Sequence, residues 1–328
     1  MAWPAGVFAD RQQTEPAVAE AVIKNTVADS TPVAAMDVEI LIGCMASYKL
    51  LGTIGEGACG IVLKARHLPS RETVAIKIAH NDDDGALMRE AKILTACVGN
   101  PAIVKLREMA RQPKSGKLCL VMEYVGPSLA EFLTFRLNSQ GRTLSELETR
   151  SVMRQLLKGV KQMHDQGVFH RDIKPGNILI GAIDGRVKIC DFGFGKSTAM
   201  PPPHTQQVGT LWYMSPEQYL GHKVYGPEID MWALGCVMAE LVTGDALFPG
   251  DNEFHQLVVV AGLLGVPDEV TGLDLGVTKG SQLREIVPED KLSNAGFDVL
   301  SGFLQFVAAD RLSAATALEM PWFSMELS

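Results

Sequence analysis

Alternating apolar and polar residues predict a series of short strands in the first part of the chain. Five segments rich in Ile, Leu and Val are separated by turn residues, and the strands are expected at 48–54, 61–66, 74–77, 103–109 and 118–124. One helix interrupts the series at residues 86–97, where Leu87, Ile93 and Leu94 recur at helical spacing. The pattern therefore predicts a mainly β region over about residues 47–124.

Helical periodicity dominates the remainder of the chain. A long amphipathic helix is expected over 145–166, with Val152, Leu156 and Val160 on one stripe and Gly167 as its stop. Two short apolar runs follow, and the turn residues between them predict a hairpin of strands at 178–180 and 187–190. Residues from about 128 to 325 are thus expected to form a larger, mostly helical region.

Residues 1–46 show neither the alternation of a strand nor the spacing of an amphipathic helix. They are rich in Ala, Val, Thr and small polar residues and have almost no aromatic residues after Phe8. Such a composition predicts a flexible N-terminal extension, with a short helix around 17–24 as its one candidate element. A docking or regulatory segment is the alternative.

Composition and charge narrow the classes of function. The net charge of −8 argues against nucleic acid or an anionic membrane as the main partner, because either favours a basic face. The six cysteines are scattered without a C-x-x-C pair, which is typical of reduced thiols rather than of a disulfide framework or a zinc site. The longest apolar run, 257–266, is too short to span a bilayer. We expect a protein of the cytoplasm, the nucleus or both.

Polar residues lie at the ends of the predicted hairpin. Asp172, Lys174 and Asn177 precede its first strand, and Asp191 follows its second. A strand pair brings these side chains to one rim, where a base, a cation and two metal-binding groups would meet. This set suits phosphate chemistry, and the alternative is a chance polar loop in an unrelated α/β protein.

A glycine-rich turn separates the first two strands. Residues 55–60 read G-E-G-A-C-G, a G-x-G-x-x-G pattern whose backbone N–H groups can close over phosphate oxygens. The motif is weak by itself, and a following helix would indicate a dinucleotide fold. Here a strand follows, with Val62 placed to cover an adenine ring.

Lys77 ends the third strand, in the segment V-A-I-K. Glu90, on the predicted helix, is the best candidate for its ionic partner. A surface lysine on an edge strand is the simpler alternative.

Taken in order, these motifs resemble the serine/threonine protein kinases. His170-Arg171-Asp172 with Asn177 matches H-R-D-x-x-x-x-N, Asp191-Phe192-Gly193 matches D-F-G, and V-A-I-K precedes both. Residues 248–257 and 264–269 look specifically like the cyclin-dependent kinase branch. The resemblance covers about residues 48–323 and implies an α+β fold of two lobes, a small β-rich one and a larger helical one.

The resemblance also implies cofactors and roles. ATP and Mg²⁺ would be the cofactors and proteins the substrates, with Asp172 deprotonating the substrate hydroxyl, Lys174 steadying the γ-phosphate, and Asn177 and Asp191 holding the metal. The residues implied to bind ATP are Ile54, Gly55, Glu56, Gly57, Ala58, Cys59, Gly60, Ile61, Val62, Lys77, Glu90, Glu123 and Val125, the last two through their backbone. His170 is expected to be a core residue, stacked with Phe192, Leu94 and Leu106.

Further residues match structural and regulatory positions of that family. Glu217, in Ser215-Pro216-Glu217, and Arg311 are expected to form a buried ion pair, and Asp230 begins a buried helix. Arg171 would accept a phosphate on the activation loop, for which Thr205 is the matching acceptor.

Some positions depart from the cyclin-dependent kinase pattern. Ala58-Cys59 replaces a Thr-Tyr pair, the helix with Glu90 lacks the cyclin-contacting signature, and Gly209 and Met214 replace residues linked to proline-directed specificity. A cyclin-like activator therefore stays an open alternative.

Two other functions fit the sequence less well. A catalytically weak scaffold with a kinase fold is disfavoured because Lys77, Asp172 and Asp191 are all present. A small-molecule phosphotransferase fits poorly with Glu217 and Arg311.

Overall fold

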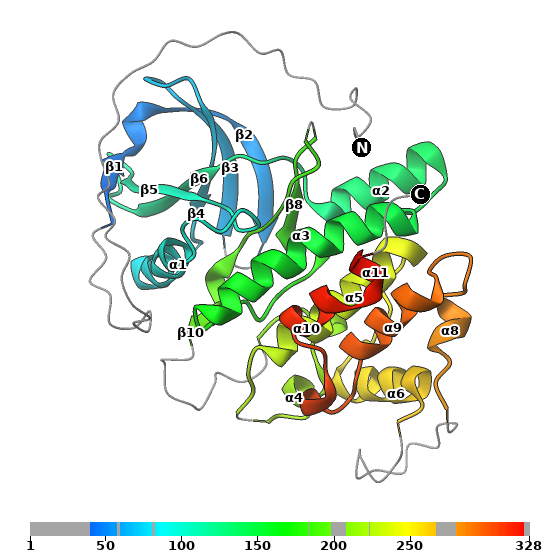
Figure 1. The fold of residues 1–328 in the computed structure, drawn as a ribbon. Coiled ribbons are helices and arrows are strands. Elements are labelled where there is room, and N and C mark those ends of the chain that lie inside the picture. Colours follow the sequence, from blue (N-terminus) through cyan, green and yellow to red (C-terminus); the bar gives the residue numbers. More distant parts are fainter. Residues whose placement is uncertain are drawn as a thin grey trace.

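The computed structural model describes residues 40–57, 60–80, 83–182, 184–197, 208–222, 224–266 and 280–324. A sheet with one packed helix forms one end of the molecule, and a larger group of helices forms the other (Figure 1). The predicted α+β fold, with a β-rich lobe followed by a helical lobe, is confirmed.

The sheet of the first lobe has six strands in the order β1-β5-β6-β4-β3-β2. Their bounds are β1 Ile42–Cys44, β2 Tyr48–Gly57, β3 Gly60–His67, β4 Thr73–Ile78, β5 Leu106–Arg111 and β6 Leu118–Glu123. Helix α1 (Asp84–Ala96) begins at Asp83, whose side chain accepts a hydrogen bond from the N–H of Ala86. Its buried residues Leu87 and Leu94 belong to the same core as Met109 of the sheet, so the helix is fixed against one face.

Strand β1 lies within the segment expected to be a flexible extension. Ile42 pairs with Met109 and Cys44 with Arg111, in parallel with β5. After the 3₁₀ turn η2 (Met45–Ser47), Tyr48 packs on the other face of the sheet, with Ala110 and Cys119. The expected boundary at residue 46 therefore falls inside the folded part of the chain, because edge pairing by a three-residue strand leaves little periodic signal.

The second lobe is built around two central helices. The helices are α2 Leu129–Gln140, α3 Glu146–Asp165, α4 Pro216–Tyr219, α5 Glu228–Thr243, α6 Glu253–Leu264, α8 Leu283–Ile286, α9 Asn294–Phe303, α10 Ala314–Glu319 and α11 Pro321–Ser324. Helix α3 begins with a capping box between Ser145 and Glu148, and its apolar stripe is buried as the spacing predicts. Helix α5 is buried along almost its whole length and forms the centre of the lobe.

The predicted hairpin is present, with residues 170–177 directly before its first strand and Asp191 after its second. Strand β8 (Ile178–Ile180) pairs antiparallel with β9 (Val187–Ile189), and β7 (Val168–Phe169) pairs with β10 (Lys196–Ser197). Short 3₁₀ turns lie directly before β8 (η3 Pro175–Asn177) and after β9 (η4 Phe192–Phe194), and two more precede α4 (η5 Leu211–Tyr213) and follow α9 (η6 Ala308–Asp310). In the described part of the chain no helix is both long and apolar enough to cross a bilayer.

Candidate active site

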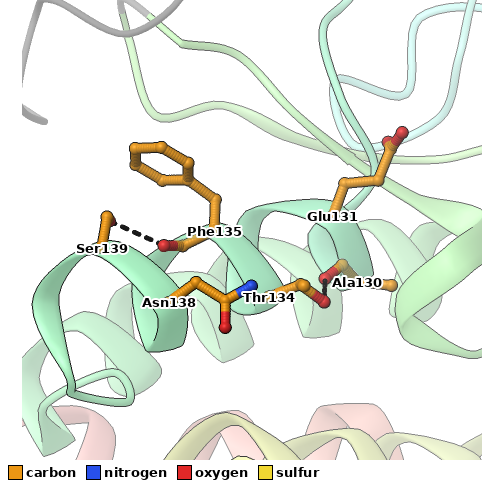
Figure 2. Close-up of a pocket in the computed structure, with 6 residues that line it drawn as sticks. All are labelled: Ala130, Glu131, Thr134, Phe135, Asn138 and Ser139. Carbon is orange, nitrogen blue, oxygen red and sulfur yellow. Dashed lines mark hydrogen bonds between the residues drawn. The ribbon is translucent and has the colours of Figure 1, made fainter.

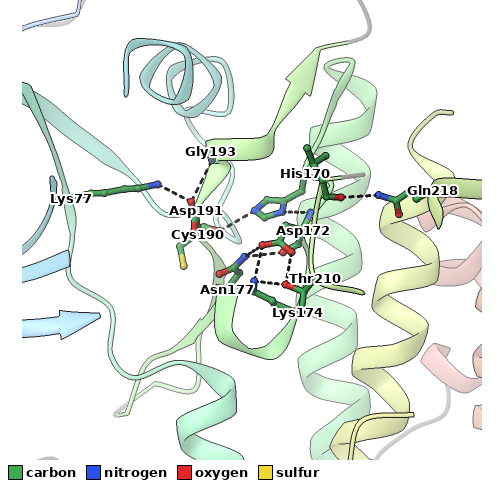
Figure 3. Close-up of polar contacts among 11 residues, drawn as sticks. Lys77, His170, Asp172, Lys174, Asn177, Cys190, Asp191, Gly193, Thr210 and Gln218 are labelled. Atoms are coloured by element: carbon green, nitrogen blue, oxygen red, sulfur yellow. Dashed lines mark hydrogen bonds and ion pairs between the residues drawn. The ribbon is translucent and has the colours of Figure 1, made fainter. Parts of the chain in front are cut away.

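Lys77 joins the two lobes through two ion pairs. Its Nζ lies 2.6 Å from Glu90 Oε2 on α1. It also lies 2.7 Å from Oδ1 of Asp191, which follows β9 (Figure 3). Burial alone would lower the pKa of Lys77, but the two carboxylates raise it well above its usual value. Burial would likewise raise the pKa of Asp191, and Lys77 holds it below its usual value. The lysine is therefore a permanent cation, shared by one carboxylate from each lobe.

Glu90 is also tied to the segment after Asp191. Its Oε1 accepts a hydrogen bond from the N–H of Phe192 at 3.2 Å, and the Phe192 ring packs edge-on against His170 with centroids 4.6 Å apart. His170 is fully buried, and its ring nitrogens contact the carbonyl of Cys190 and the N–H of Asp172. These contacts fit the core role expected for His170, with Leu94 in the same apolar core.

Asp172 lies at the centre of a second polar group. Its Oδ2 accepts a hydrogen bond from Asn177 Nδ2 at 2.9 Å and lies 2.8 Å from Lys174 Nζ. Its Oδ1 accepts from the hydroxyl of Thr210 at 3.0 Å, and Lys174 donates to the same hydroxyl at 2.6 Å (Figure 3). The structure thus brings together the base and the cation that the sequence placed at one rim.

Asp230 fixes the start of the catalytic loop, which comprises residues 170–177. This buried residue of α5 accepts hydrogen bonds from the backbone N–H groups of His170 (2.8 Å) and Arg171 (2.9 Å), and its Oδ2 lies 3.0 Å from His164 Nε2. Burial would raise the pKa of Asp230, but these contacts with His164 and the loop hold it below its usual value. Arg171 has φ +71°, a conformation that costs a non-glycine residue about 1–3 kcal/mol. The Asp230 contacts offset that cost.

The glycine-rich segment, residues 55–60, spans the end of β2 and the start of β3. Gly55 pairs with Val62, Glu56 with Ile61 and Gly57 with Gly60. At Gly60, φ is +137° and a Cβ would lie 2.1 Å from the carbonyl oxygen of Ile78, so only glycine fits there. Ile54 is partly exposed on β2. Ala58 and Cys59, also expected to bind nucleotide, lie outside the described residues.

The side chain of Glu123, the last residue of β6, is engaged in contacts within the protein. The Glu123 carboxylate lies 2.6 Å from Lys188 Nζ and accepts from the N–H of Lys105 at 2.7 Å, so it is held against the second lobe. Val125 follows two residues later and packs against the main core. Met122 is buried among core residues, as ordinary packing predicts.

Glu217 and Arg311 form a bidentate buried ion pair. Both guanidinium nitrogens lie 2.6 Å from a carboxylate oxygen, and the Arg311 side chain has no exposed surface. Arg311 Nε also donates to the carbonyl of Gln305 at 2.8 Å. The pair joins α4 to the loop that follows α9.

We expect Arg311→Ala to lower the free energy of unfolding by about 3–5 kcal/mol, because it leaves the Glu217 carboxylate buried without its partner. Urea unfolding measures the change. Arg107→Ala is the matched control, since Arg107 makes a bidentate but exposed pair with Glu72 and should cost less than about 1 kcal/mol. Equal effects of the two substitutions would contradict this assignment.

Arg171 and Lys196 place two cations close together. Arg171 donates to the carbonyl of Phe194 and to the Tyr225 hydroxyl. Lys196 is buried, and its pKa is lowered by that burial and by the charge of Arg171. Thr205, the expected phosphate acceptor, lies outside the described residues.

Thr210 is the functional residue that the sequence analysis missed. The sequence motifs assign it no role, yet its hydroxyl contacts both Asp172 and Lys174. The available signal was a threonine directly before the segment that leads to Ser215-Pro216-Glu217. A local sequence pattern of this kind does not reveal a hydrogen bond to Asp172, which lies 38 positions earlier in the chain.

A hollow of about 550 Å³ lies along helix α2 (Figure 2). It is lined by Ala130, Glu131, Thr134, Phe135, Asn138 and Ser139. All six come from one helix, and none belongs to the expected site.

Comparison with known families agrees with this geometry. Residues 48–323 match the protein kinase domain, and the chain therefore belongs to the protein kinase family. Its relatives place it among the serine/threonine kinases that resemble cyclin-dependent kinases. It is 44% identical to the putative cyclin-dependent kinase F-2 of Oryza sativa subsp. japonica, over 85% of this chain and 90% of the relative. It is 36% identical to cyclin-dependent kinase B2-1 of Arabidopsis thaliana (87% and 96%) and 38% identical to cyclin-dependent kinase 20 of Danio rerio (85% and 84%). The family predicted from the motifs is confirmed.

Proposed function

We propose that this chain transfers the γ-phosphate of ATP to serine and threonine hydroxyls of protein substrates. The observation that carries the proposal is the meeting of Lys77, Glu90 and Asp191, from three separate elements, at 2.6 and 2.7 Å. Phosphoryl transfer needs little covalent chemistry from the protein, so positioning and charge neutralisation dominate. A lysine that pairs with a carboxylate from each lobe supplies the positioning and the positive charge.

The donor atoms of the site suit a magnesium nucleotide. Asn177 Nδ2 donates to Asp172, so the amide oxygen is the ligand that Asn177 can offer, beside the Asp191 carboxylate. Such oxygen ligands are those that Mg²⁺ prefers. Bound Mg²⁺ would neutralise phosphate charge, while Lys77 would bind the α and β phosphates.

The second polar group would act on the acceptor. Asp172 would accept the proton of the substrate hydroxyl, and Lys174, 2.8 Å from its carboxylate, would contact the γ-phosphate. Thr210 holds both side chains in place by its hydroxyl. The arrangement supports transfer to an alcohol brought beside Asp172.

An assay with Mg²⁺ and ATP on serine, threonine and tyrosine peptide mixtures tests the proposal. Phosphate on serine or threonine supports it. Nucleotide binding without any transfer would indicate a scaffold with a kinase fold. Phosphate found only on small metabolites added to the assay would indicate a small-molecule phosphotransferase.

We also propose protein substrates as the partners and the cytoplasm or nucleus as the location. The names of the relatives indicate dependence on cyclins, and a cyclin-like protein is the activator to test for this chain. Mass spectrometry of proteins that co-purify with it would identify such a partner.

Thr205→Ala is expected to lower turnover about tenfold, the equivalent of roughly one hydrogen bond between charged groups. A phosphate on Thr205 would bind the cations Arg171 and Lys196, and this contact would order the activation loop, which contains Thr205. The measurement compares kcat of the variant with that of wild-type protein whose phosphorylation is established by mass spectrometry. An equal rate for unphosphorylated wild-type protein would contradict this role.

A further inference from the structure

Gln218 is a buried amide that bridges two segments beside the site. It lies on α4, directly after Glu217, and is 4% exposed. Its Oε1 accepts from the backbone N–H of Ser215 at 3.0 Å and from the Ser215 hydroxyl at 3.1 Å. Its Nε2 donates to the carbonyl oxygen of Val208 at 3.2 Å. Both ends of the amide are therefore in use.

The segment that Gln218 holds leads directly to Thr210. Gly209 has φ +116°, and a Cβ there would lie 2.8 Å from the carbonyl oxygen of Arg171, so its backbone packs against the catalytic loop. Thr210 then bonds to Asp172 and Lys174. Val208 and Thr210 are thus each held by hydrogen bonds, and Gly209 between them packs closely against Arg171. Figure 3 shows the Gln218 side chain pointing toward the side of the molecule where Asp172 and Thr210 lie.

Capping of α4 explains only half of these contacts. A capping box needs a side-chain acceptor at this position, and glutamate serves as well as glutamine. The hydrogen bond to Val208 needs a donor, which glutamate lacks when ionised. The amide is the group that can accept from Ser215 and donate to Val208 at the same time.

We propose that Gln218 is a positioning residue for the phosphate acceptor. By fixing the Val208 carbonyl it holds Thr210, and through Thr210 it holds Asp172 and Lys174 in the arrangement that receives the substrate hydroxyl. This inference rests on the proposed function. None of the Gln218 hydrogen bonds involves Lys77, Glu90 or Asp191, so its effect should fall on the protein substrate and not on the nucleotide.

The test uses the full chain and the peptide that it phosphorylates fastest in a serine/threonine library, at pH 8. Gln218→Glu keeps the acceptor for Ser215 and removes the donor to Val208. We expect kcat/KM for the peptide to fall about threefold to tenfold, which corresponds to one lost hydrogen bond, while the Kd for ATP changes less than twofold. Gln305→Glu is the matched control, because Gln305 is an exposed amide that also donates to a backbone carbonyl, and it should change neither constant.

Gln218→Leu removes both functions of the amide and does not depend on the ionisation of a new carboxyl group. It should lower kcat/KM for the peptide at least as much, again with the Kd for ATP retained. Wild-type peptide kinetics in both variants would overturn the inference, as would parallel losses of peptide and ATP binding with a smaller folded fraction. If the wild-type chain transfers no phosphate, the proposed function fails instead, and the two failures are distinguishable.

Discussion

Asp172→Asn should lower the rate of phosphate transfer by about 10²- to 10⁴-fold, the range contributed by a positioned general base. Asparagine nearly keeps the shape of the side chain but cannot take the proton of a substrate hydroxyl. It also places a neutral amide 2.8 Å from Lys174 Nζ, so the cation loses its carboxylate. Single-turnover assays with radiolabelled ATP measure the loss.

Nucleotide binding is the internal control for this variant. Lys77, Glu90 and Asp191 do not contact Asp172 through any hydrogen bond or ion pair in the described residues, and the Kd for ATP should therefore stay within about twofold, less than 0.5 kcal/mol. Asp165→Asn, which alters an exposed carboxylate paired with Lys161, should leave both constants unchanged. Full activity of Asp172→Asn would remove Asp172 from its assigned role.

The site residues that were predicted from the sequence all lie in or next to short sequence motifs. Asp172, Asn177 and Asp191 flank two apolar strands whose pairing follows from a short turn, and local pattern was therefore enough to bring them together. Glu90 could be assigned to Lys77 because the helical period placed it on the face that packs against the sheet.

The features that the sequence did not predict depend on contacts between distant segments. The hydrogen bond from Thr210 to Asp172 joins residues 38 positions apart, and the ion pair of Lys188 with Glu123 joins residues 65 apart. Strand β1 finds its partner β5 more than sixty residues later. No local period encodes such pairings, because each joins segments that are far apart in the sequence and meet only in the folded chain.

Lys77→Met should reduce transfer by at least about 10²-fold, a loss of roughly 3 kcal/mol of transition-state stabilisation. The substitution removes the cation that lies 2.7 Å from Asp191 and 2.6 Å from Glu90. Two carboxylates then remain where triphosphate charge must be held, and the Kd for ATP should rise as well. A transfer rate within tenfold of wild type would exclude the assigned role for Lys77.

The same substitution predicts a dependence of stability on pH. Burial already raises the pKa of Glu90 despite Lys77, and removal of the lysine raises it further. The folded state then binds a proton more tightly than the unfolded state does, so the free energy of unfolding of Lys77→Met falls as pH rises through that pKa. The deficit relative to wild type, about 3–5 kcal/mol when Glu90 is ionised, should therefore be smaller at pH 5.5 than at pH 8 in urea unfolding. A deficit of equal size at both pH values would show that the ionised Glu90 is not the cause of the lost stability.

The double variant Lys77→Met/Glu90→Gln is the control. It has no buried carboxyl group at position 90, so most of the loss in the free energy of unfolding, and its dependence on pH, should disappear.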